Sequence, residues 1–512
     1  MQIQAVIKDI DIIEVSGVLS GEVSAICYDS RKCEKDSLFV AVSGLKLDGH
    51  LYIEEAVDRG AKFVVHEKNY SPPPGVTSIM VLNSRAILGV LGKNFYDDPS
   101  SRLCLIGVTG TNGKTTVTYL LEAMLKAAGF SVGVLGTVNY RFNNREMTAP
   151  HTTPESYELQ NIMRIMVDQG VTHVVMEVSS HAVDLRRVDE CSFDMGIFTN
   201  LSQDHLDYHK TLESYFQAKK RFFAEILPAG KKTYAHRMIL NGDDPWGRRI
   251  ADEVGPVVPY RTFCIEKRCD MTAERYAFSL EGTRADINTG GSRFAIFSPL
   301  IGKFNLYNIL ASVTAASLVG VPERFIRSGL ENLRNVPGRL EKVSVTGEPE
   351  VFVDYAHTED ALKRVLQNLA PFKKGRIITV FGCGGDRDRG KRPLMGKAAV
   401  TWSDLAILTS DNPRTEEPLS IIEQIEKGMG GNSTRKLLPG KLKKNGNEKG
   451  YVVIPDRREA IKKAIALADS SDIILIAGKG HEDYQIIGEK RIPFDDRHVA
   501  REALNKRRRT EH

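Results

Sequence analysis

A glycine-rich segment with one lysine, GVTGTNGKTT at residues 107–116, has the residue types that bind phosphate. It follows the apolar run LCLIGVTG and precedes the helical pattern TTVTYLLEAMLKAAG. Glycines let backbone amides approach phosphate oxygens, and the start of a helix adds partial positive charge. Lys114 can reach the β- and γ-phosphates of a nucleotide, and the Thr115 hydroxyl can bind Mg²⁺. The predicted phosphate-binding residues are Gly110, Thr111, Asn112, Gly113, Lys114, Thr115 and Thr116.

The common loop pattern G-x-x-x-x-G-K-[ST] is not met, because Val108 stands five residues before Gly113. A shorter G-x-x-G-K-T begins at Gly110 instead. The alternative is a glycine-rich turn with a chance lysine, which the strand-loop-helix context disfavours.

A second candidate is Lys219, in a predicted helix from about Leu212 to Leu227. At about 100° per residue, its apolar side chains share one face, and Lys219 projects near the middle of that face. A buried amine has a lowered pKa, and a neutral amine can react with CO₂ to give a carbamate. Such an anion could bind Mg²⁺, which prefers oxygen ligands. The alternative is a lysine whose ammonium reaches solvent or an ion-pair partner.

A third candidate is TSDNPR, residues 409–414, which closes the apolar run DLAILTS. Asp, Asn and Pro all form turns, so a plain turn is one interpretation. A clamp for a small molecule that carries both signs of charge is the other.

The elements that must position these residues alternate strands and helices, which predicts an α/β fold in three domains. We expect an N-terminal domain at 1–98, a central phosphate-loop domain with a mainly parallel sheet at 99–335, and a doubly wound, Rossmann-like domain at 336–512. The last has motif loops after four predicted strands, and ligands bind at the carboxyl ends of such strands. The polar segment GMGGNSTRKLLPGKLKKNGNEKG, residues 428–450, is predicted to be a surface loop.

Composition excludes several classes of protein. The 512 residues are 42% hydrophobic and 26% charged with a net charge of +5, as in an ordinary globular protein, and no basic-aromatic stripe indicates nucleic-acid binding. No apolar run reaches membrane-spanning length, and the N-terminus lacks a signal-peptide pattern. The seven scattered cysteines include no CxxC pair, which argues against a disulfide framework or a zinc site and favours a structural role for Cys264 and Cys269. We expect a cytoplasmic protein.

Ten motifs now point to a family. They are GTNGKTT, MEVSSH, TNLSQDHLDYH, AKKRFF, GKFNLYN, PGRLE, DYAHT, FGCGGDRDRGKRPLMG, DNPR and AGKGHEDYQ, in this order along the chain. The chain resembles the Mur ligase family, the ATP-dependent amino-acid ligases of peptidoglycan synthesis. The resemblance covers nearly the whole chain and is closest to the members that add diaminopimelate.

The resemblance implies a reaction in which ATP phosphorylates the D-glutamate γ-carboxylate of UDP-N-acetylmuramoyl-L-alanyl-D-glutamate. An amine of meso-2,6-diaminopimelate then attacks the acyl phosphate. The implied catalytic residues are Lys114, Lys219, His205, Glu177 and Arg339. Thr115, Glu177, His205 and a carbamylated Lys219 are the implied Mg²⁺ ligands, and Asn308 and Asp354 join the phosphate loop as ATP contacts. The family also implies a monomer.

Substrate contacts follow residue by residue from the same resemblance. Ser30, with the SGLKLDG loop around Gly44 beside it, is implied to meet the uridine end of the UDP-linked substrate. Its other implied contacts are Thr152, Thr153, Ser179 and Arg187. His151, Leu185 and Glu359 depart from residues common in the family, and these departures concern substrate contacts rather than the reaction.

The loops of the C-terminal domain are then the expected diaminopimelate site. Arginine offers a planar fork for carboxylates, which makes Arg387 and Arg414 the carboxylate candidates. Asp411, Asn412 and Glu482 are the candidates for the distal ammonium, Gly478 allows close backbone approach, and Pro413 stiffens the loop.

Several alternatives stay open. A lysine-adding relative would need no arginine for a distal carboxylate, so Arg414 favours diaminopimelate. A folylpolyglutamate synthetase is disfavoured by DNPR and GGDRD. A non-enzymatic nucleotide switch would need an NKxD motif, which is missing here, and a scaffold of α/β interaction modules is the last alternative.

Overall fold

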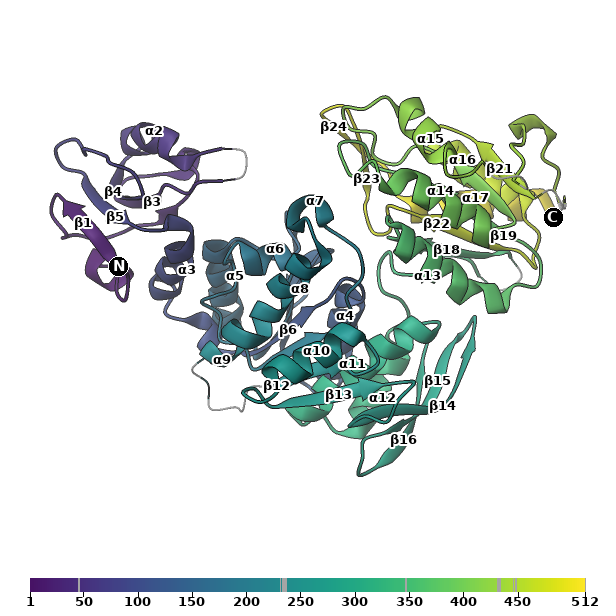
Figure 1. Cartoon of the computed structure of the whole chain (residues 1–512), viewed down its shortest axis with the longest axis horizontal. Helices are drawn as coiled ribbons and strands as arrows, with labels where there is room; N and C mark the ends of the chain where they lie inside the picture. The colour runs from purple at the N-terminus through teal and green to yellow at the C-terminus, as the bar shows by residue number, and fades with distance from the viewer. Residues whose placement is uncertain are drawn as a thin grey trace.

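Three large sheets organise the described part of the chain, and Figure 1 shows them in three lobes. The computed structural model describes residues 1–44, 47–230, 232, 237–345, 348–430, 434–444, 446 and 449–511. Leu45 and Lys46 of the predicted uridine loop, and residues 431–433, 445, 447 and 448 of the predicted surface loop, lie outside the described residues. Most described residues of that surface loop are exposed, as predicted, while Met429 and Leu437 are buried.

The N-terminal sheet has five strands in the order β1-β5-β4-β3-β2, all parallel except β1. Its strands are β1 (Ile12–Ser16), β2 (Ile26–Cys27), β3 (Ser37–Val40), β4 (Ala61–His66) and β5 (Thr77–Val81). Its helices are α1 (Ile3–Val6), η1 (Ser30–Lys32), η2 (Gly49–Tyr52), α2 (Ile53–Asp58) and α3 (Ser84–Phe95). Helix α3 lies between this sheet and the central lobe (Figure 1).

The central sheet has eleven strands in the order β16-β15-β14-β13-β12-β11-β6-β10-β7-β8-β9. The middle of the sheet consists of parallel strands, in the spatial order β14, β13, β12, β11, β6, β10 and β7. Antiparallel strands are added at both edges. The strands are β6 (Cys104–Thr109), β7 (Val132–Leu135), β8 (Asn139–Phe142), β9 (Arg145–Thr148), β10 (His173–Glu177), β11 (Met195–Phe198), β12 (Arg237–Asn241), β13 (Tyr260–Cys264), β14 (Met271–Ser279), β15 (Gly282–Asn288) and β16 (Arg293–Ser298).

Helices cover both faces of the central sheet, because its middle strands are apolar on both sides. The helices are η3 (Pro99–Arg102), α4 (Lys114–Ala127), α5 (Ser156–Asp168), α6 (Ser180–Asp184), α7 (Leu206–His209), α8 (Leu212–Arg221), the π-helical turn η4 (Phe222–Ile226), α9 (Leu227–Ala229), α10 (Pro245–Val254), α11 (Lys303–Val319) and α12 (Glu323–Asn332).

The C-terminal sheet has the order β17-β18-β22-β19-β20-β21 and is parallel except for β17. Its strands are β17 (Glu341–Lys342), β18 (Glu350–Asp354), β19 (Ile377–Phe381), β20 (Leu405–Leu408), β21 (Gly450–Val453) and β22 (Ile473–Ala477), with a separate hairpin of β23 (Tyr484–Ile487) and β24 (Lys490–Pro493). Its helices are α13 (Glu359–Leu369), η5 (Ala370–Phe372), α14 (Lys391–Trp402), α15 (Pro418–Glu426), η6 (Pro439–Lys441), α16 (Arg457–Leu467) and α17 (Asp496–Glu511).

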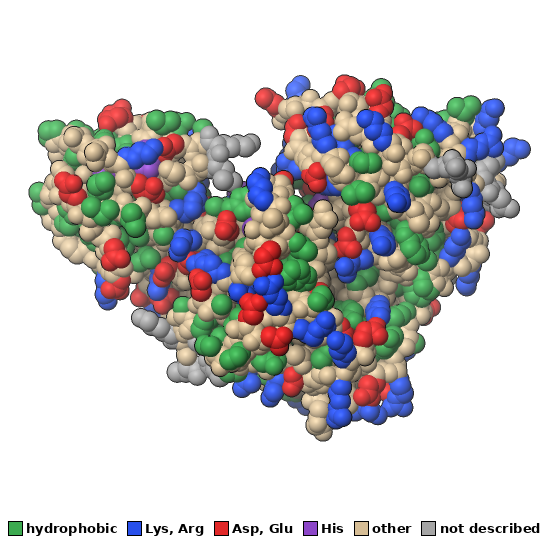
Figure 2. Space-filling model, in the orientation of Figure 1, with side chains coloured by type: hydrophobic (Ala, Val, Ile, Leu, Met, Phe, Trp, Pro, Cys, Tyr) green, Lys and Arg blue, Asp and Glu red, His purple; other side chains and the backbone are tan. Residues whose placement is uncertain are grey.

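The predicted α/β class, with a mainly parallel central sheet and a doubly wound C-terminal sheet, is confirmed. We propose domain boundaries near residues 98 and 335, since no sheet formed by the described residues contains strands from both sides of either position. Figure 2 shows a notch between the N-terminal and C-terminal lobes, above the central lobe, and α7 rises toward this notch in Figure 1.

One disulfide, Cys264–Cys269, was not predicted from the sequence. Strands β13 and β14 are parallel neighbours joined by a short loop, and this arrangement brings the two Cα atoms to 5.6 Å. The other five cysteines are free. None of the helices in the described ranges combines the length and apolar character that a membrane crossing requires.

Candidate active site

The phosphate loop joins β6 to α4, as predicted, and two glycines give it its shape. Gly110 has φ +142° and Gly113, the residue before the first turn of α4, has φ +90°. A Cβ at Gly113 would lie 2.3 Å from Asn308 Oδ1, so the side chain from α11 closes on this glycine. The backbone amides of Thr111 and Asn112 donate to Asn200, which follows β11. The loop is therefore held from two neighbouring elements.

This close approach gives a first prediction. Gly113→Ala should raise the KM for ATP by about tenfold, because the new methyl group displaces Asn308 and distorts the loop. Gly129→Ala is the matched control, since Gly129 has a similar φ of +88° with no atom of the described residues within 4 Å of its Cβ position. Steady-state kinetics of both variants checks the prediction. Equal effects on the KM for ATP would contradict it, because backbone strain alone would then account for the loss.

Lys114 is folded back into the loop. Its Nζ donates to the carbonyls of Gly110 and Thr111, both at 2.9 Å. Burial lowers the pKa of this amine from its usual value, and an anion in the loop would oppose that shift. The loop thus has a cation at its centre where phosphate charge can be neutralised.

Glu177 collects hydroxyl and amide donors at the end of β10. Thr115 Oγ1 and the Thr137 amide each donate to its Oε1 at 3.0 Å, and Thr137 Oγ1 donates to Oε2 at 3.0 Å. Arg339 Nη2 reaches across from the C-terminal lobe and donates to Thr115 Oγ1 at 3.1 Å. This contact brings the two lobes together over the phosphate loop.

Asp354, at the end of β18, lies close to Arg339. It accepts a hydrogen bond of 2.6 Å from the Leu340 amide, and burial raises its pKa to about 6 against the opposing charge of Arg339. The aromatic ring of the next residue, Tyr355, lies 4.9 Å from the Arg339 guanidinium. Arg339 is thereby fixed between the two lobes.

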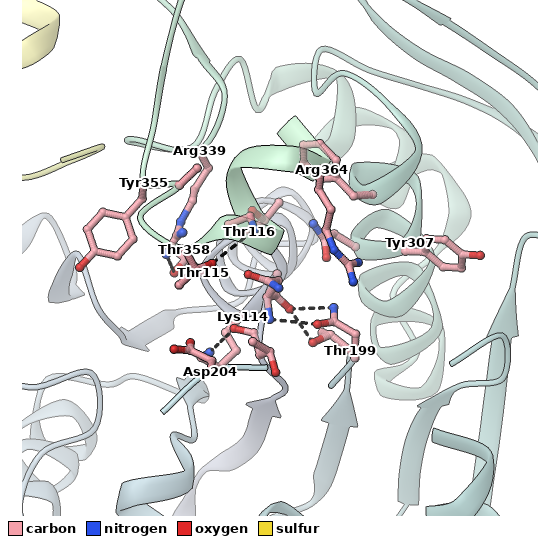
Figure 3. Close-up of a pocket in the computed structure, with 18 of the residues that line it drawn as sticks. Lys114, Thr115, Thr116, Thr199, Asp204, Tyr307, Arg339, Tyr355, Thr358 and Arg364 are labelled. Atoms are coloured by element: carbon pink, nitrogen blue, oxygen red, sulfur yellow. Dashed lines mark hydrogen bonds between the residues drawn. The ribbon is translucent and has the colours of Figure 1, made fainter. Parts of the chain in front are cut away.

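The phosphate loop, Glu177, Arg339 and Asp354 surround a cavity of about 440 Å³ (Figure 3). Its lining joins the phosphate loop and Glu177 to residues from the C-terminal lobe, including Thr358 and Arg364 of the DYAHT segment and α13. Of the predicted residues, the cavity brings together Thr111, Asn112, Gly113, Lys114, Thr115, Thr116, Thr152, Glu177, Ser179, His205, Asn308, Arg339 and Asp354.

Lys219 lies behind the phosphate loop and does not line this cavity. Its side chain is 1% exposed, which excludes the solvent-reaching alternative. Its Nζ donates to the Gly110 carbonyl at 3.0 Å and lies 4.7 Å from the Tyr215 ring. Burial, with the nearby Lys114 cation, lowers the pKa of the Lys219 amine well below its usual range. A lowered pKa favours the neutral amine, which is the form that carbamate formation requires.

His205 directly precedes α7, with φ +53°, and its side chain is 46% exposed and lines the cavity. Its ring stacks edge-on against His181 at 4.9 Å and lies 6.2 Å from Tyr215. Tyr215 thus contacts both His205 and Lys219. The structure places these two predicted residues next to the same aromatic ring.

The donor set suits Mg²⁺ in part. Among the described residues, no cluster of three or more His, Cys, Asp and Glu side chains has metal-site geometry. Thr115 and Glu177 nevertheless offer neighbouring oxygens on the cavity wall, and Mg²⁺ keeps several waters and binds substrate phosphates. The residues present fit an ion held jointly by protein and nucleotide.

The predicted contacts to the UDP-linked substrate divide between two lobes. Ser30 is in the N-terminal lobe, where its hydroxyl donates to Glu55 at 2.9 Å. Thr153 Oγ1 donates to the Glu177 carbonyl at 2.8 Å, and Arg187 Nη1 donates to the Thr153 carbonyl at 3.1 Å. Ser179 caps α6. The central-lobe contacts adjoin the cavity, while Ser30 lies apart from it.

The predicted diaminopimelate residues meet at the carboxyl ends of β19, β20 and β22. Arg414 Nη1 donates to the Gly385 carbonyl at 2.8 Å, and both Arg414 and Arg387 come within 4 Å of the Cβ position of Gly384. Asn412 donates to Glu482 at 2.9 Å. A Cβ at Gly478, which has φ +117°, would lie 3.3 Å from Asp411 Oδ2. Pro413 is buried between Asn412 and Arg414.

Sequence reasoning missed two residues that organise these sites. Thr137 makes two of the three hydrogen bonds to Glu177 described above, and only its place after β7 could have indicated it. Lys479 is 0% exposed, and its Nζ donates to Asn412 Oδ1 at 3.0 Å and to Glu482 at 3.1 Å. Its position inside AGKGHE was a usable signal.

Comparison with known proteins identifies the family. Residues 22–96 match the model "Mur ligase family, catalytic domain", residues 108–316 the "Mur ligase middle domain" and residues 338–480 the "Mur ligase, glutamate ligase domain". A protein of Geobacter metallireducens is 47% identical over 97% of both chains. The chain belongs to the Mur ligase family. The predictions of an ATP-dependent ligase and of peptidoglycan synthesis are confirmed.

The similar proteins have more particular names. The Geobacter metallireducens relative is named UDP-N-acetylmuramoyl-L-alanyl-D-glutamate–2,6-diaminopimelate ligase. A solved structure with the same name has a TM-score of 0.69 and 32% identity, and the match covers 99% of each chain. A folylpolyglutamate synthase from Mycobacterium tuberculosis shares only the fold, with 16% identity, a TM-score of 0.61 and coverage of 77% of this chain and 92% of that one.

Proposed function

We propose that this protein joins meso-2,6-diaminopimelate to the D-glutamate of UDP-N-acetylmuramoyl-L-alanyl-D-glutamate, using ATP, in peptidoglycan precursor synthesis. The observation that carries the proposal is the Arg339–Thr115 contact, which brings the C-terminal loops onto the phosphate loop. The relative at 47% identity with this activity in its name supports the choice of substrates.

The reaction has two steps. The γ-carboxylate of D-glutamate attacks the γ-phosphorus of ATP, so that an acyl phosphate forms and ADP leaves. The diaminopimelate amine then attacks the acyl carbon, the C–O bond to phosphate breaks, and the nitrogen loses a proton as the amide forms. Phosphoryl transfer depends on positioning and charge neutralisation more than on covalent help.

The cavity residues suit these needs. Lys114 and Arg339 bring positive charge to the transferred phosphoryl group from opposite lobes. Glu177 and Thr115 would hold Mg²⁺, which supplies further charge neutralisation when bound. Asn308 closes on Gly113 beside the nucleotide, and Asp354 positions Arg339.

Lys219 and His205 would complete the metal and phosphate environment from behind the loop and from α7. As a carbamate, Lys219 would offer oxygen ligands in place of an ammonium. Asp411 and Glu482 would meet the distal ammonium of diaminopimelate, and Arg387 and Arg414 its carboxylates. In this structure Asn412 uses its amide within the protein, so we assign it to holding Lys479 and Glu482. We further propose that the protein acts as a cytoplasmic monomer, with no nucleic-acid or membrane partner.

The test is a phosphate-release assay with purified protein, ATP and Mg²⁺. Phosphate should appear continuously only when both UDP-N-acetylmuramoyl-L-alanyl-D-glutamate and diaminopimelate are present. Lysine in place of diaminopimelate should give a kcat/KM lower by about 10²-fold, because the arginines then lack a carboxylate partner. Equal use of lysine would identify a lysine-adding enzyme, and turnover with a folyl substrate would identify the other alternative.

A further inference from the structure

A fully buried lysine, Lys479, sits among the acidic groups of the C-terminal loop cluster. Its ammonium lies 3.1 Å from Glu482 Oε2, 3.0 Å from Asn412 Oδ1 and 3.7 Å from Asp411 Oδ1. The Tyr484 ring lies 5.5 Å from the same nitrogen. This lysine therefore makes its polar contacts with three residues of the predicted diaminopimelate site.

The contacts of Lys479 leave one acidic atom without a hydrogen bond. Asp411 is only 6% exposed, and its buried Oδ1 accepts no hydrogen bond from the described residues, since the Lys479 ammonium at 3.7 Å is beyond hydrogen-bond distance. Glu482, in contrast, is engaged by both Lys479 and Asn412. Burying a carboxylate oxygen without a hydrogen-bond donor costs free energy. An incoming cation would therefore be stabilised most by contact with this atom.

The two signs of charge are separated within the cluster. Asp411 and Glu482 lie around Lys479, while Arg414 and Arg387 converge on Gly384. Two carboxylates would suit an acceptor that ends in a bare ammonium. Lys479 neutralises one of these two negative charges. The other can then pair with a single added ammonium beside Arg414 and Arg387.

We propose that Lys479 is a specificity-determining residue that sets the charge of the acceptor pocket. The inference rests on the function proposed above. With Lys479 present, the pocket favours an acceptor whose distal end is a zwitterion with no net charge. Without it, the pocket is more negative by one charge and favours an acceptor that carries net positive charge.

Diaminopimelate and lysine make a direct probe of this idea. At neutral pH free diaminopimelate has no net charge and lysine has a charge of +1, while both have an ammonium at the same distal carbon. Their ratio of kcat/KM therefore reports the charge of the pocket, because the loss of an ammonium contact common to both cancels. A lysine that only anchors the loops would affect both acceptors equally.

The experiment measures this ratio, lysine over diaminopimelate, for the full-length wild type and four variants. Lys479→Met should raise the ratio by about tenfold, the order expected for one unit charge in a partly solvated site. Lys479→Arg retains the charge and should stay near the wild-type ratio even if its kcat falls. Lys490→Met is the control, since Lys490 is exposed in the adjoining hairpin and should change nothing.

The double variant Lys479→Met/Glu482→Gln removes one charge of each sign. It should return the ratio toward the wild-type value, and it leaves no additional unpaired carboxylate if the single variant folds poorly. An unchanged ratio in Lys479→Met, or an equally raised ratio in the double variant, would overturn the inference. A wild type that turns over neither acceptor would instead contradict the proposed function itself.

Discussion

Replacing Lys219 with alanine is expected to lower kcat by about 10³-fold, the loss typical of removing a preorganised charge-stabilising group. The side chain reaches the carbonyl of Gly110 from a fully buried position on α8. Its removal takes away the candidate carbamate and opens a space directly behind the phosphate loop. The KM values for ATP and the acceptor should change much less than kcat, because the nucleotide cavity is lined by other residues.

Two controls make this result interpretable. Lys220→Ala should retain full activity, since Lys220, on the same helix as Lys219, pairs with Glu253 of α10. Short carboxylates such as acetate should partly restore turnover in Lys219→Ala, because they can supply oxygen ligands in the vacated space. Chloride at the same concentration should not. Full activity of Lys219→Ala would refute the carbamate role. A large loss of thermal stability together with the loss of activity would indicate a folding defect.

The helix around Lys219 shows why the sequence was informative there. The helical pattern predicted one buried face, and Tyr215, Phe216, Lys219, Phe222 and Phe223 are all buried. The π-helical turn from Phe222 to Ile226 was not predicted, because an extra residue in one turn leaves the apolar pattern nearly unchanged over so short a range. The pattern could also give only the direction of Lys219, not its contact with Gly110.

The strands of the sheets were predictable in proportion to how deeply they are buried. Parallel middle strands such as β6, β10 and β22 are continuous apolar runs, which sequence reading recognises readily. The edge hairpin β8–β9 and the β14–β16 meander have mixed burial, and their pairing depends on contacts distant in sequence. The sequence therefore predicts the loops at the ends of buried strands better than it predicts the pairing of the edge strands in the central sheet.

The individual residue pairs that join the lobes could not be predicted from the sequence. Arg339 and Thr115 are 224 residues apart, and nothing local to either residue predicts their hydrogen bond. The family resemblance named both residues, but it did not say which partner each would have. The same holds for Lys479, whose importance is visible only once Asn412 and Glu482 are seen around its ammonium.

Replacing Arg414 with alanine is expected to raise the KM for diaminopimelate by about 10²-fold, equivalent to about 2.7 kcal/mol for a lost charge-assisted contact. In this structure Arg414 has φ +52° and donates to the Gly385 carbonyl. Its backbone is fixed by hydrogen bonds to Ile486 and Gly488, so the alanine variant should keep the loop in place. The KM for ATP should stay near its wild-type value, because Arg414 does not line the nucleotide cavity.

Arg458→Ala is a suitable control, since Arg458 pairs with Glu502 on the surface. Lysine gives a second test, because it lacks the distal carboxylate. If Arg414 binds that carboxylate, Arg414→Ala should lose little kcat/KM with lysine, and discrimination between the two acceptors should nearly disappear. An unchanged KM for diaminopimelate would remove Arg414 from the site. An equal loss with both acceptors would mean that Arg414 holds the carboxylate common to both, which would leave Arg387 as the candidate for the distal one.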